Sequence, residues 1–249
     1  AMNGFHALMY HEIIDREGYD REQYKGIKVK QCYHDVLPED LFCFKDEFEK
    51  QMTYLYENGY NTLTIQQVID YYYNNKPIPE KSVLLTFDDA YKSVLFNAYP
   101  ILKKYHFHAV CFVVLGWLFD EAQEYAKEYS VCMSKDELLS MKDVFEYGNH
   151  TNLLHTRRGM KSALQTEDKD TVLADLSKCE SFVTAKKIFA YPFGLYDKEN
   201  IDWLKEFGTL LAFTSTDGLN TKDTNPLELH RNACRLQYSI NDFIKMLEV

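Results

Sequence analysis

Three short stretches of the chain carry side chains that could do chemistry together. Asp88 and Asp89 are adjacent carboxylates, His150 and His155 are imidazoles five residues apart, and His11 follows a short apolar stretch. Two neutral imidazoles and one carboxylate can hold a divalent ion with positions left open for water and substrate. A second carboxylate can accept a proton from water, and a further imidazole can donate one to a leaving group. Together these groups would suit metal-assisted hydrolysis of an ester or an amide.

Each group also has an ordinary structural explanation. The adjacent acids could cap the helix that follows them, and lone histidines are usually surface or core residues. Two histidines five residues apart lie about 140° apart around a helix and face opposite sides of a flat strand. If His150 and His155 share an ion, they must therefore lie in a turn that leaves a strand, and Gly148 precedes them at a suitable place.

The acids follow a predicted buried strand. Residues 83–87 are large and apolar with one Thr, which is typical of a strand buried on both faces of a parallel sheet. Parallel α/β folds place their functional groups at the carboxyl ends of such strands. Neighbouring strand residues point to opposite faces, so the chain must bend after residue 87 if Asp88 and Asp89 serve one site.

Strands and helices alternate along the rest of the chain. We expect strands at residues 8–13, 83–87, 109–115, 144–147, 187–191, 210–214 and 227–232. We expect helices at 45–58, after the cap Thr64, at 94–105, after the cap Ser134, from the cap Thr166 to Phe182, from Asp197 to about Phe207, and after the cap Ser239. Residues 15–40 and 117–133 show no clean period and read as loop, edge or irregular insertion. The alternation predicts an α/β fold with a parallel sheet, and polar residues at so many strand ends favour a barrel over an open doubly wound sheet.

Length and composition limit the class of protein. The 249 residues suffice for one large domain, and no linker or repeat divides them, so we expect a single domain over residues 1–249. The net charge of −10 argues against a nucleic-acid partner and offers no basic handle for anionic lipid. No apolar run approaches the length of a transmembrane segment, and no signal peptide is present, although a removed leader or anchor stays open. The six cysteines form no Cys-x-x-Cys pair, so we favour free thiols over a cysteine zinc site.

These motifs resemble those of the polysaccharide deacetylases of the NodB homology group, carbohydrate esterase family 4. Residues 86–89, Thr-Phe-Asp-Asp, are similar to the first family motif, which implies that Asp88 is the catalytic base and that Asp89 binds the metal. Residues 150–155 are similar to the second motif, which implies that His150 and His155 bind the metal. Residues 190–194 are similar to the third motif, which lines the substrate groove and gives a backbone N–H to the oxyanion. This similarity implies substrate or oxyanion contacts for Tyr191, Pro192, Phe193 and Gly194.

One branch of the family is especially similar. The spacing of five between the histidines resembles the branch that deacetylates poly-β-1,6-N-acetylglucosamine, whose motif order is permuted. In that branch the catalytic acid lies in an N-terminal Tyr-His segment, which here is Tyr10-His11 and implies that His11 is the acid. His230 lies near the place where unpermuted members keep this histidine and is a competing candidate. The family fold is a distorted (β/α)7 TIM-like barrel, in agreement with the alternation of strands and helices.

The sequence also departs from the family pattern. Ala190 stands where common members have an Arg that orients the base, and Arg231 is a candidate replacement. Ala90 follows Asp89 where Gly is usual. The fourth motif is not recognisable, and Asp217 is a candidate for it.

The resemblance implies a metal-dependent deacetylase acting on an acetylated polysaccharide or oligosaccharide. It would hydrolyse N-acetyl groups of an amino-sugar polymer, such as poly-N-acetylglucosamine, a chitin-like glycan or peptidoglycan, to acetate and free amine. Zn²⁺ is the expected metal, with Co²⁺ or Ni²⁺ as alternatives. An O-acetyl esterase acting on a glycan such as xylan, and a glycan-binding member with weak turnover, are the alternative functions. Family habit favours an extracellular or cell-surface location, although nothing in these residues requires export.

Overall fold

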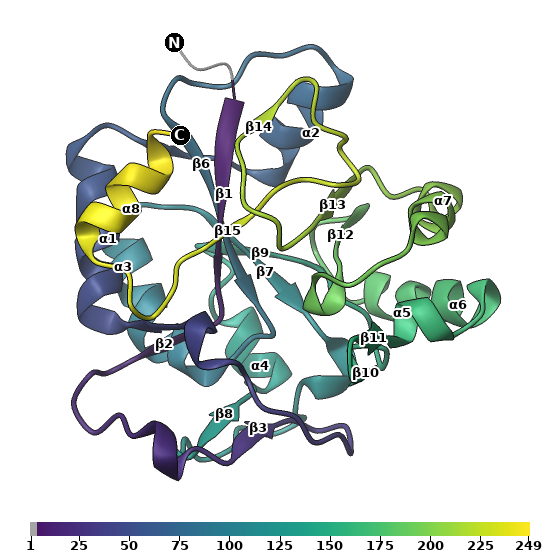
Figure 1. The fold of residues 1–249 in the computed structure, drawn as a ribbon, viewed down its shortest axis with the longest axis horizontal. Coiled ribbons are helices and arrows are strands. Elements are labelled where there is room, and N and C mark those ends of the chain that lie inside the picture. The colour runs from purple at the N-terminus through teal and green to yellow at the C-terminus, as the bar shows by residue number, and fades with distance from the viewer. Residues whose placement is uncertain (1–3) are drawn as a thin grey trace.

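The computed structural model describes residues 4–249, which form a curled sheet surrounded by helices (Figure 1). The strand order is β13-β12-β9-β7-β6-β1-β14, with β15 beside β1 and β5 beside β6. These strands are β1 (Gly4–Tyr10), β5 (Asn61–Thr62), β6 (Ser82–Asp88), β7 (Ala109–Val113), β9 (Phe145–Asn149), β12 (Ile188–Ala190), β13 (Leu211–Phe213), β14 (Asn220–Thr221) and β15 (Asn232–Ala233). Among the described strands of this sheet, β14 pairs antiparallel and the others pair parallel.

The segment entering β15 links the two sides of the curled sheet. Asn232 and Ala233 of β15 pair with β1, and Leu229 just before them forms a parallel bridge with Phe213 of β13. The backbone N–H of Thr214 donates to the Leu229 carbonyl at 2.8 Å. One short segment therefore contacts both β1 and β13, which curls the sheet toward a barrel. The α/β fold with a distorted TIM-like barrel, predicted from sequence, is confirmed.

The apolar strand β6 packs against both sides of the sheet. Val83, Leu85 and Phe87 belong to the larger core cluster, whereas Leu84 belongs to a second cluster on the other face. This alternation follows from the two-residue period of a strand. Burying such side chains stabilises the fold by about 1.5–3 kcal/mol each, so β6 is a firm base for the two acids at its end.

The helices lie around this sheet. They are α1 (Lys45–Glu57), α2 (Ile65–Tyr73), α3 (Tyr99–Lys104), α4 (Lys135–Leu139), α5 (Ala163–Thr166), α6 (Lys169–Glu180), α7 (Lys198–Phe207) and α8 (Ile240–Leu247). Helices α1, α3 and α8 gather on one side in Figure 1, and α5, α6 and α7 on the other. None of the helices within residues 4–249 has the length and apolarity needed to cross a membrane.

Most predicted helix starts are confirmed by capping boxes. Thr64, Ser134, Asp197 and Ser239 each cap the helix that follows. The prediction that Thr166 caps the helix reaching Phe182 is wrong. Thr166 ends α5, and Asp168 caps α6 by accepting from the Thr171 N–H at 2.8 Å.

The helix predicted over residues 94–105 is divided. It consists of a π turn, η3 (Val94–Ala98), followed by α3. Pro100 has no N–H to give to the preceding turn, and the Tyr99 N–H bonds five residues back to Val94.

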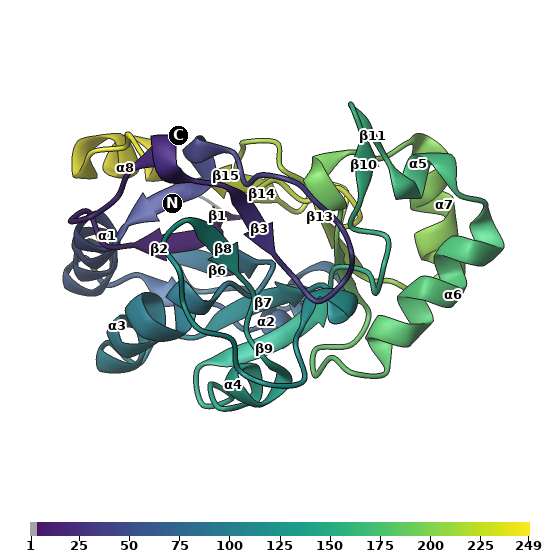
Figure 2. The same cartoon turned by 90° about the horizontal axis from the view of Figure 1, so that it is seen from below.

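Two segments without sequence periodicity meet across the carboxyl ends of the strands. β3 (Gly26–Lys28) pairs with β8 (Tyr129–Val131), and β2 (Glu12–Ile14) pairs with β4 (Phe42–Phe44). The short hairpin β10 (Arg157–Arg158) and β11 (Lys161–Ser162) projects nearby (Figure 2). The turns η1 (Arg21–Gln23), η2 (Glu39–Leu41), η4 (Leu115–Trp117) and η5 (Pro192–Gly194) complete the connections. All six cysteines are free, as predicted.

Candidate active site

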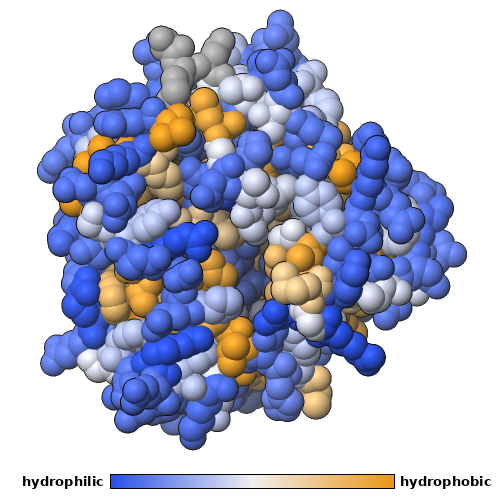
Figure 3. All heavy atoms as spheres, in the orientation of Figure 1, coloured by the Kyte–Doolittle hydropathy of each residue, from blue (hydrophilic) through white to orange (hydrophobic). Residues whose placement is uncertain are grey.

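A pocket of about 270 Å³ lies at the carboxyl ends of the strands. His11, Asp88, Asp89, His150 and His155 all line it. The space-filling view shows a hollow near the middle of the face that it presents, with hydrophobic side chains on the edge of the hollow (Figure 3). The volume lies just below the range of about 300–1,000 Å³ for small-molecule pockets, so the site suits a small ligand or a small part of a larger one.

The chain bends after β6 so that both acids face this pocket. Asp88 is the last residue of β6, and Asp89 and Ala90 have left-handed φ angles of 79° and 61°. The Asp89 N–H donates to the Phe112 carbonyl at 2.9 Å, which fixes the bend to β7. A left-handed conformation costs a non-glycine residue about 1–2 kcal/mol. Ala90 takes this conformation at a position where the similar family motif usually has glycine.

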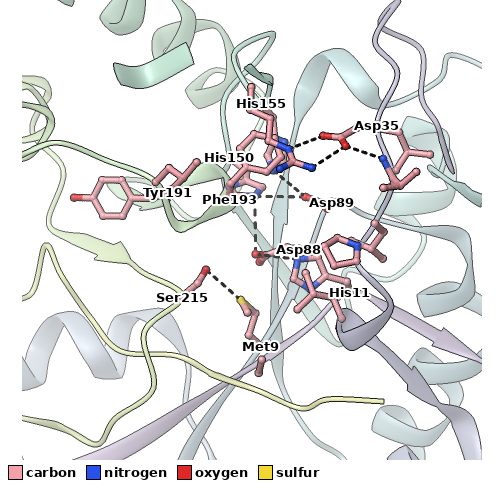
Figure 4. Close-up of a pocket in the computed structure, with 18 of the residues that line it drawn as sticks. Met9, His11, Asp35, Asp88, Asp89, His150, His155, Tyr191, Phe193 and Ser215 are labelled. Carbon is pink, nitrogen blue, oxygen red and sulfur yellow. Dashed lines mark hydrogen bonds and ion pairs between the residues drawn. The ribbon is translucent and has the colours of Figure 1, made fainter. Parts of the chain in front are cut away.

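The two histidines lie in a turn that leaves β9, as their spacing requires. Thr151 has a φ of 78°, and its N–H donates to the Asn149 side chain. The Asp175 carboxylate on α6 accepts from the N–H groups of Asn152 and Leu153, both at 2.8 Å. These bonds hold the turn in place, so both imidazoles point toward Asp89 (Figure 4).

Asp89, His150 and His155 form a compact cluster. The Asp89 Oδ1 lies 3.4 Å from Nε2 of His150 and 3.5 Å from Nε2 of His155. The ligand atoms of the three residues all lie within 4.8 Å of one another. The His150 Nδ1 is 2.7 Å from the Ala190 carbonyl, to which it donates, so its Nε2 carries the lone pair.

The cluster fits a divalent cation. Ligand atoms about 2.1 Å from a tetrahedral ion lie about 3.4 Å apart, close to the separations seen here. Asp89 Oδ1 is buried and has no hydrogen-bond partner among residues 4–249, as expected for an atom reserved for an ion. Burial lowers the pKa of His155 to about 4, so its imidazole is neutral and able to ligate. Burial acts to raise the pKa of Asp89, but His155 and His150 outweigh it, and the pKa lies below its usual value.

Asp88 is held by a fully buried arginine. Arg231 Nη1 and Nη2 donate to the two Asp88 oxygens at 2.7 and 2.9 Å, and Nε donates to the Thr214 carbonyl. Burial acts to raise the pKa of Asp88, but the positive charge of Arg231 outweighs it and keeps Asp88 ionised. Arg231 thus makes the contact that Ala190 cannot make.

His11 lies beside Asp88, as His150 does. Its Nε2 is 3.7 Å from Asp88 Oδ2, and its side chain is buried in the pocket wall. Burial lowers the pKa of His11, although Asp88 and Asp89 counteract this. His230 lines a different cavity, where its Nδ1 lies 3.3 Å from the Thr216 carbonyl, and Asp217 lines a third. The structure does not bring these two residues to the Asp88 pocket.

The third motif presents Phe193 to the site. Phe193 has a left-handed φ of 61°, its ring lies 4.3 Å from that of His155, and no described residue accepts from its backbone N–H. Tyr191 points away from the cluster in Figure 4, and its hydroxyl donates to the Leu227 carbonyl. Pro192 is buried, and the Cα of Gly194 packs against Ser215. Of the four, the Phe193 N–H is best placed to meet a substrate.

Sequence reasoning did not single out Asp35, Trp117 or Arg157, which also line the pocket. Asp35 and Trp117 lie in the two stretches without periodicity, which gave no local signal. Arg157 follows His155 by two residues, and this proximity was the only hint. The buried Trp117 Nε1–H has no partner in the described part of the chain, which leaves a donor free at the pocket.

Next to His11, Glu12 is a buried acid with an unusual pKa. It is 2% exposed, and the Ser93 hydroxyl donates to its Oε1 at 2.6 Å. Burial raises its pKa from 4.5 to about 7, although hydrogen bonds from Ser93 and Ser130 oppose the rise. The folded protein therefore holds this proton more tightly than the unfolded chain does.

We predict that Glu12→Gln removes a pH-dependent loss of stability. With a folded pKa above the unfolded one, Glu12 contributes stability below about pH 4.5 that is lost as the pH rises through about 7. At pH 8 the variant should be more stable relative to wild type than at pH 4.5, by about 3 kcal/mol. Urea unfolding at both pH values measures this, with the exposed Glu49→Gln as control. Parallel pH profiles for wild type and Glu12→Gln would contradict the prediction.

The chain belongs to the polysaccharide deacetylase family, whose sequence profile matches residues 75–212. The relatives include the poly-beta-1,6-N-acetyl-D-glucosamine N-deacetylase of Staphylococcus aureus (strain N315), which is 30% identical over 196 residues. That alignment covers 75% of this chain and 66% of the relative, so the chain spans just under two thirds of its length.

Solved structures share the fold. The Streptococcus pyogenes deacetylase PplD, in complex with acetate, has a TM-score of 0.77 at 22% identity, with 99% of each chain covered. IcaB from Ammonifex degensii has a TM-score of 0.74 at 23% identity, covering 100% of this chain and 98% of that one. The predicted family and its NodB-type fold are thereby confirmed.

Proposed function

We propose that this polysaccharide deacetylase is a metal-dependent N-deacetylase that hydrolyses acetamido groups of an amino-sugar polymer. Poly-β-1,6-N-acetylglucosamine is the preferred substrate because the Staphylococcus aureus relative is named for it. The observation that carries the proposal is the convergence of Asp89, His150 and His155, with Asp88 ionised beside them. An extracellular or cell-surface location would match a polymeric substrate of this kind.

Each residue has a defined task. Asp89, His150 and His155 hold the ion, with Zn²⁺ as first choice and Co²⁺ or Ni²⁺ as alternatives. A divalent cation there supplies Lewis-acid chemistry, polarising the acetyl carbonyl and making water easier to deprotonate. Asp88, oriented by Arg231, accepts a proton from the attacking water. The Phe193 N–H donates to the oxyanion, and His11 protonates the departing nitrogen, so that acetate and a free amine leave.

A panel of acetylated oligosaccharides tests this function. Acetate release is measured after metal removal and after addition of Zn²⁺, Co²⁺ or Ni²⁺, on N-acetylated glucosamine oligomers and on O-acetylated xylan fragments. The proposal expects metal-dependent release from the N-acetylated series. Release from the xylan series alone would indicate the O-acetyl esterase, and sugar binding without release would indicate a glycan-binding member. The Arg231–Asp88 pair favours the enzyme, since the apparent loss of the orienting arginine was the reason to consider weak turnover.

A comparison of His11→Ala with His230→Ala tests the acid. We expect His11→Ala to lower kcat by about 10²-fold or more, with the alkaline limb of the pH–rate profile changed, because a general acid must be protonated to act. His230→Ala should retain near wild-type activity because His230 lies outside the pocket. A loss of activity confined to His230→Ala would move the role to His230.

A further inference from the structure

His155 differs from His150 in how its ring is held. His150 Nδ1 is fixed by the Ala190 carbonyl, whereas His155 Nδ1 is buried and bonds to no other residue in the described range. Metal-binding histidines usually donate their second nitrogen to an acceptor, which sets the direction of the ring. Something else must therefore orient the His155 imidazole.

Neighbouring aromatic rings orient the His155 imidazole. The His155 ring is flanked by Trp117 at 4.5 Å and by Phe193 at 4.3 Å between centroids, with interplanar angles of 57° and 58°. The centroid of the His150 ring lies 4.5 Å from that of His155, with an interplanar angle of 70°. Such tilted contacts are favourable and restrict rotation of the ring, provided that the flanking rings are themselves fixed.

Both flanking rings have a partner behind them. Tyr33 stacks on Trp117 with centroids 6.2 Å apart and an angle of 22°. The Arg157 guanidinium lies 5.2 Å from the centroid of Phe193. A guanidinium at this distance from an aromatic face is attracted to it.

Asp35 ties these two partners together. Arg157 Nε and Nη2 donate to its two oxygens, each at 3.0 Å, and the Tyr33 hydroxyl donates to Oδ2 at 2.7 Å. The backbone N–H of Arg157 donates in turn to the Tyr33 hydroxyl at 3.3 Å. Burial acts to raise the pKa of Asp35, but the bonds from Arg157 and Tyr33 outweigh it, so Asp35 is a carboxylate. Figure 4 shows the two dashed bonds that reach Asp35 from the His155 side of the pocket.

We propose that Tyr33, Asp35 and Arg157 form a clamp that fixes the His155 ring through Trp117 and Phe193. The three are positioning residues for the metal site, and the inference rests on the proposed function only in taking His155 as a ligand. Because Phe193 also carries the free backbone N–H, the clamp sets the oxyanion donor and the metal ligand together. It links the stretch 29–38, which has no sequence periodicity, to the turn that carries His155. The role of this stretch is then to help position the His155 ring.

The test compares Zn²⁺ affinity among conservative variants. Asp35→Asn keeps the shape of the side chain but loses its charge, and Arg157→Lys keeps the charge but loses the paired bonds and the planar stack. Each should weaken Zn²⁺ binding by about ten-fold or more, measured by competition with a chromophoric chelator. The double variant should bind Zn²⁺ only slightly more weakly than the single variant with the lower affinity. Either single change already breaks the Asp35–Arg157 pair, so the two effects should not add.

A second ion pair of the chain supplies the matched control. Arg16 bonds to Asp46 through Nε and Nη2 at 2.8 and 2.9 Å, and its guanidinium lies 4.1 Å from the Phe44 centroid. This pair has the same chemistry but does not line the pocket. Asp46→Asn and Arg16→Lys should leave Zn²⁺ affinity within about two-fold of wild type, well below the change expected at the clamp.

The outcomes separate the clamp from the function. Unchanged Zn²⁺ affinity in Asp35→Asn and Arg157→Lys overturns the clamp, and so does a rise in KM alone, which would make the pair a substrate contact. Equal losses in the control pair also overturn it. If wild type binds Zn²⁺ but releases no acetate, the function fails while the affinity comparison still decides the clamp. A wild-type chain that binds neither Zn²⁺, Co²⁺ nor Ni²⁺ overturns both.

Discussion

His150→Ala is expected to remove metal binding and to lower acetate release by about 10³-fold or more. The variant lacks one of three ligands, and the Ala190 carbonyl that held its ring loses its donor. Metal content is measured by elemental analysis of the purified protein, and acetate by an enzyme-coupled assay.

Two further variants make the His150 result decisive. Asp89→Asn keeps the shape of the site and should also lose the ion, which guards against a folding defect in His150→Ala. His106→Asn changes an exposed histidine in a left-handed turn and should behave as wild type. Metal content and acetate release at wild-type levels in His150→Ala would end the assignment of the cluster as a metal site.

The second large effect is expected at Arg231. Arg231→Met leaves the Asp88 carboxylate buried without its partner, and the free energy of unfolding should fall by about 3–5 kcal/mol. Arg231 is fully buried and Asp88 is 2% exposed, so the bonds that are lost lie in the protein interior. Urea unfolding of the purified variants measures the loss.

A double variant separates stability from catalysis. In Arg231→Met with Asp88→Asn no charge of the pair remains, so much of the stability should return while acetate release stays lost. The exposed Arg16→Met serves as control and should leave the free energy of unfolding close to that of wild type. A free energy of unfolding for Arg231→Met equal to that of wild type would show that the pair does not hold the base.

Much of the site could be predicted because its residues follow local rules. Asp88 and Asp89 end an apolar strand, and strand geometry alone requires the bend that the left-handed φ of Asp89 provides. The spacing of His150 and His155 excluded a helix and a flat strand, which left the turn that is observed. These inferences needed only the period of an element and the place where it ends.

The remaining features depend on contacts that leave no local trace. β15 is Asn232–Ala233 rather than the predicted strand at 227–232, because its position is set by pairing with β1 and by the bridge to β13. The pairing of β3 with β8 joins two stretches without periodicity. Thr166 and Asp168 are both good caps, and the capping box of Ser162 on α5 decided between them.

The closing segment before β15 has a consequence for biosynthesis. Asp88 leaves the ribosome 143 residues before the arginine that neutralises it. A nascent chain that has emerged only as far as α7 already carries Asp89, His150 and His155, but its sheet is still open and its base lacks its partner. The earlier strands can assemble during translation, whereas catalytic competence must wait for the last barrel segment. Until residues 229–233 have been made, no segment of the chain can pair with β1 and bridge to β13 in this way.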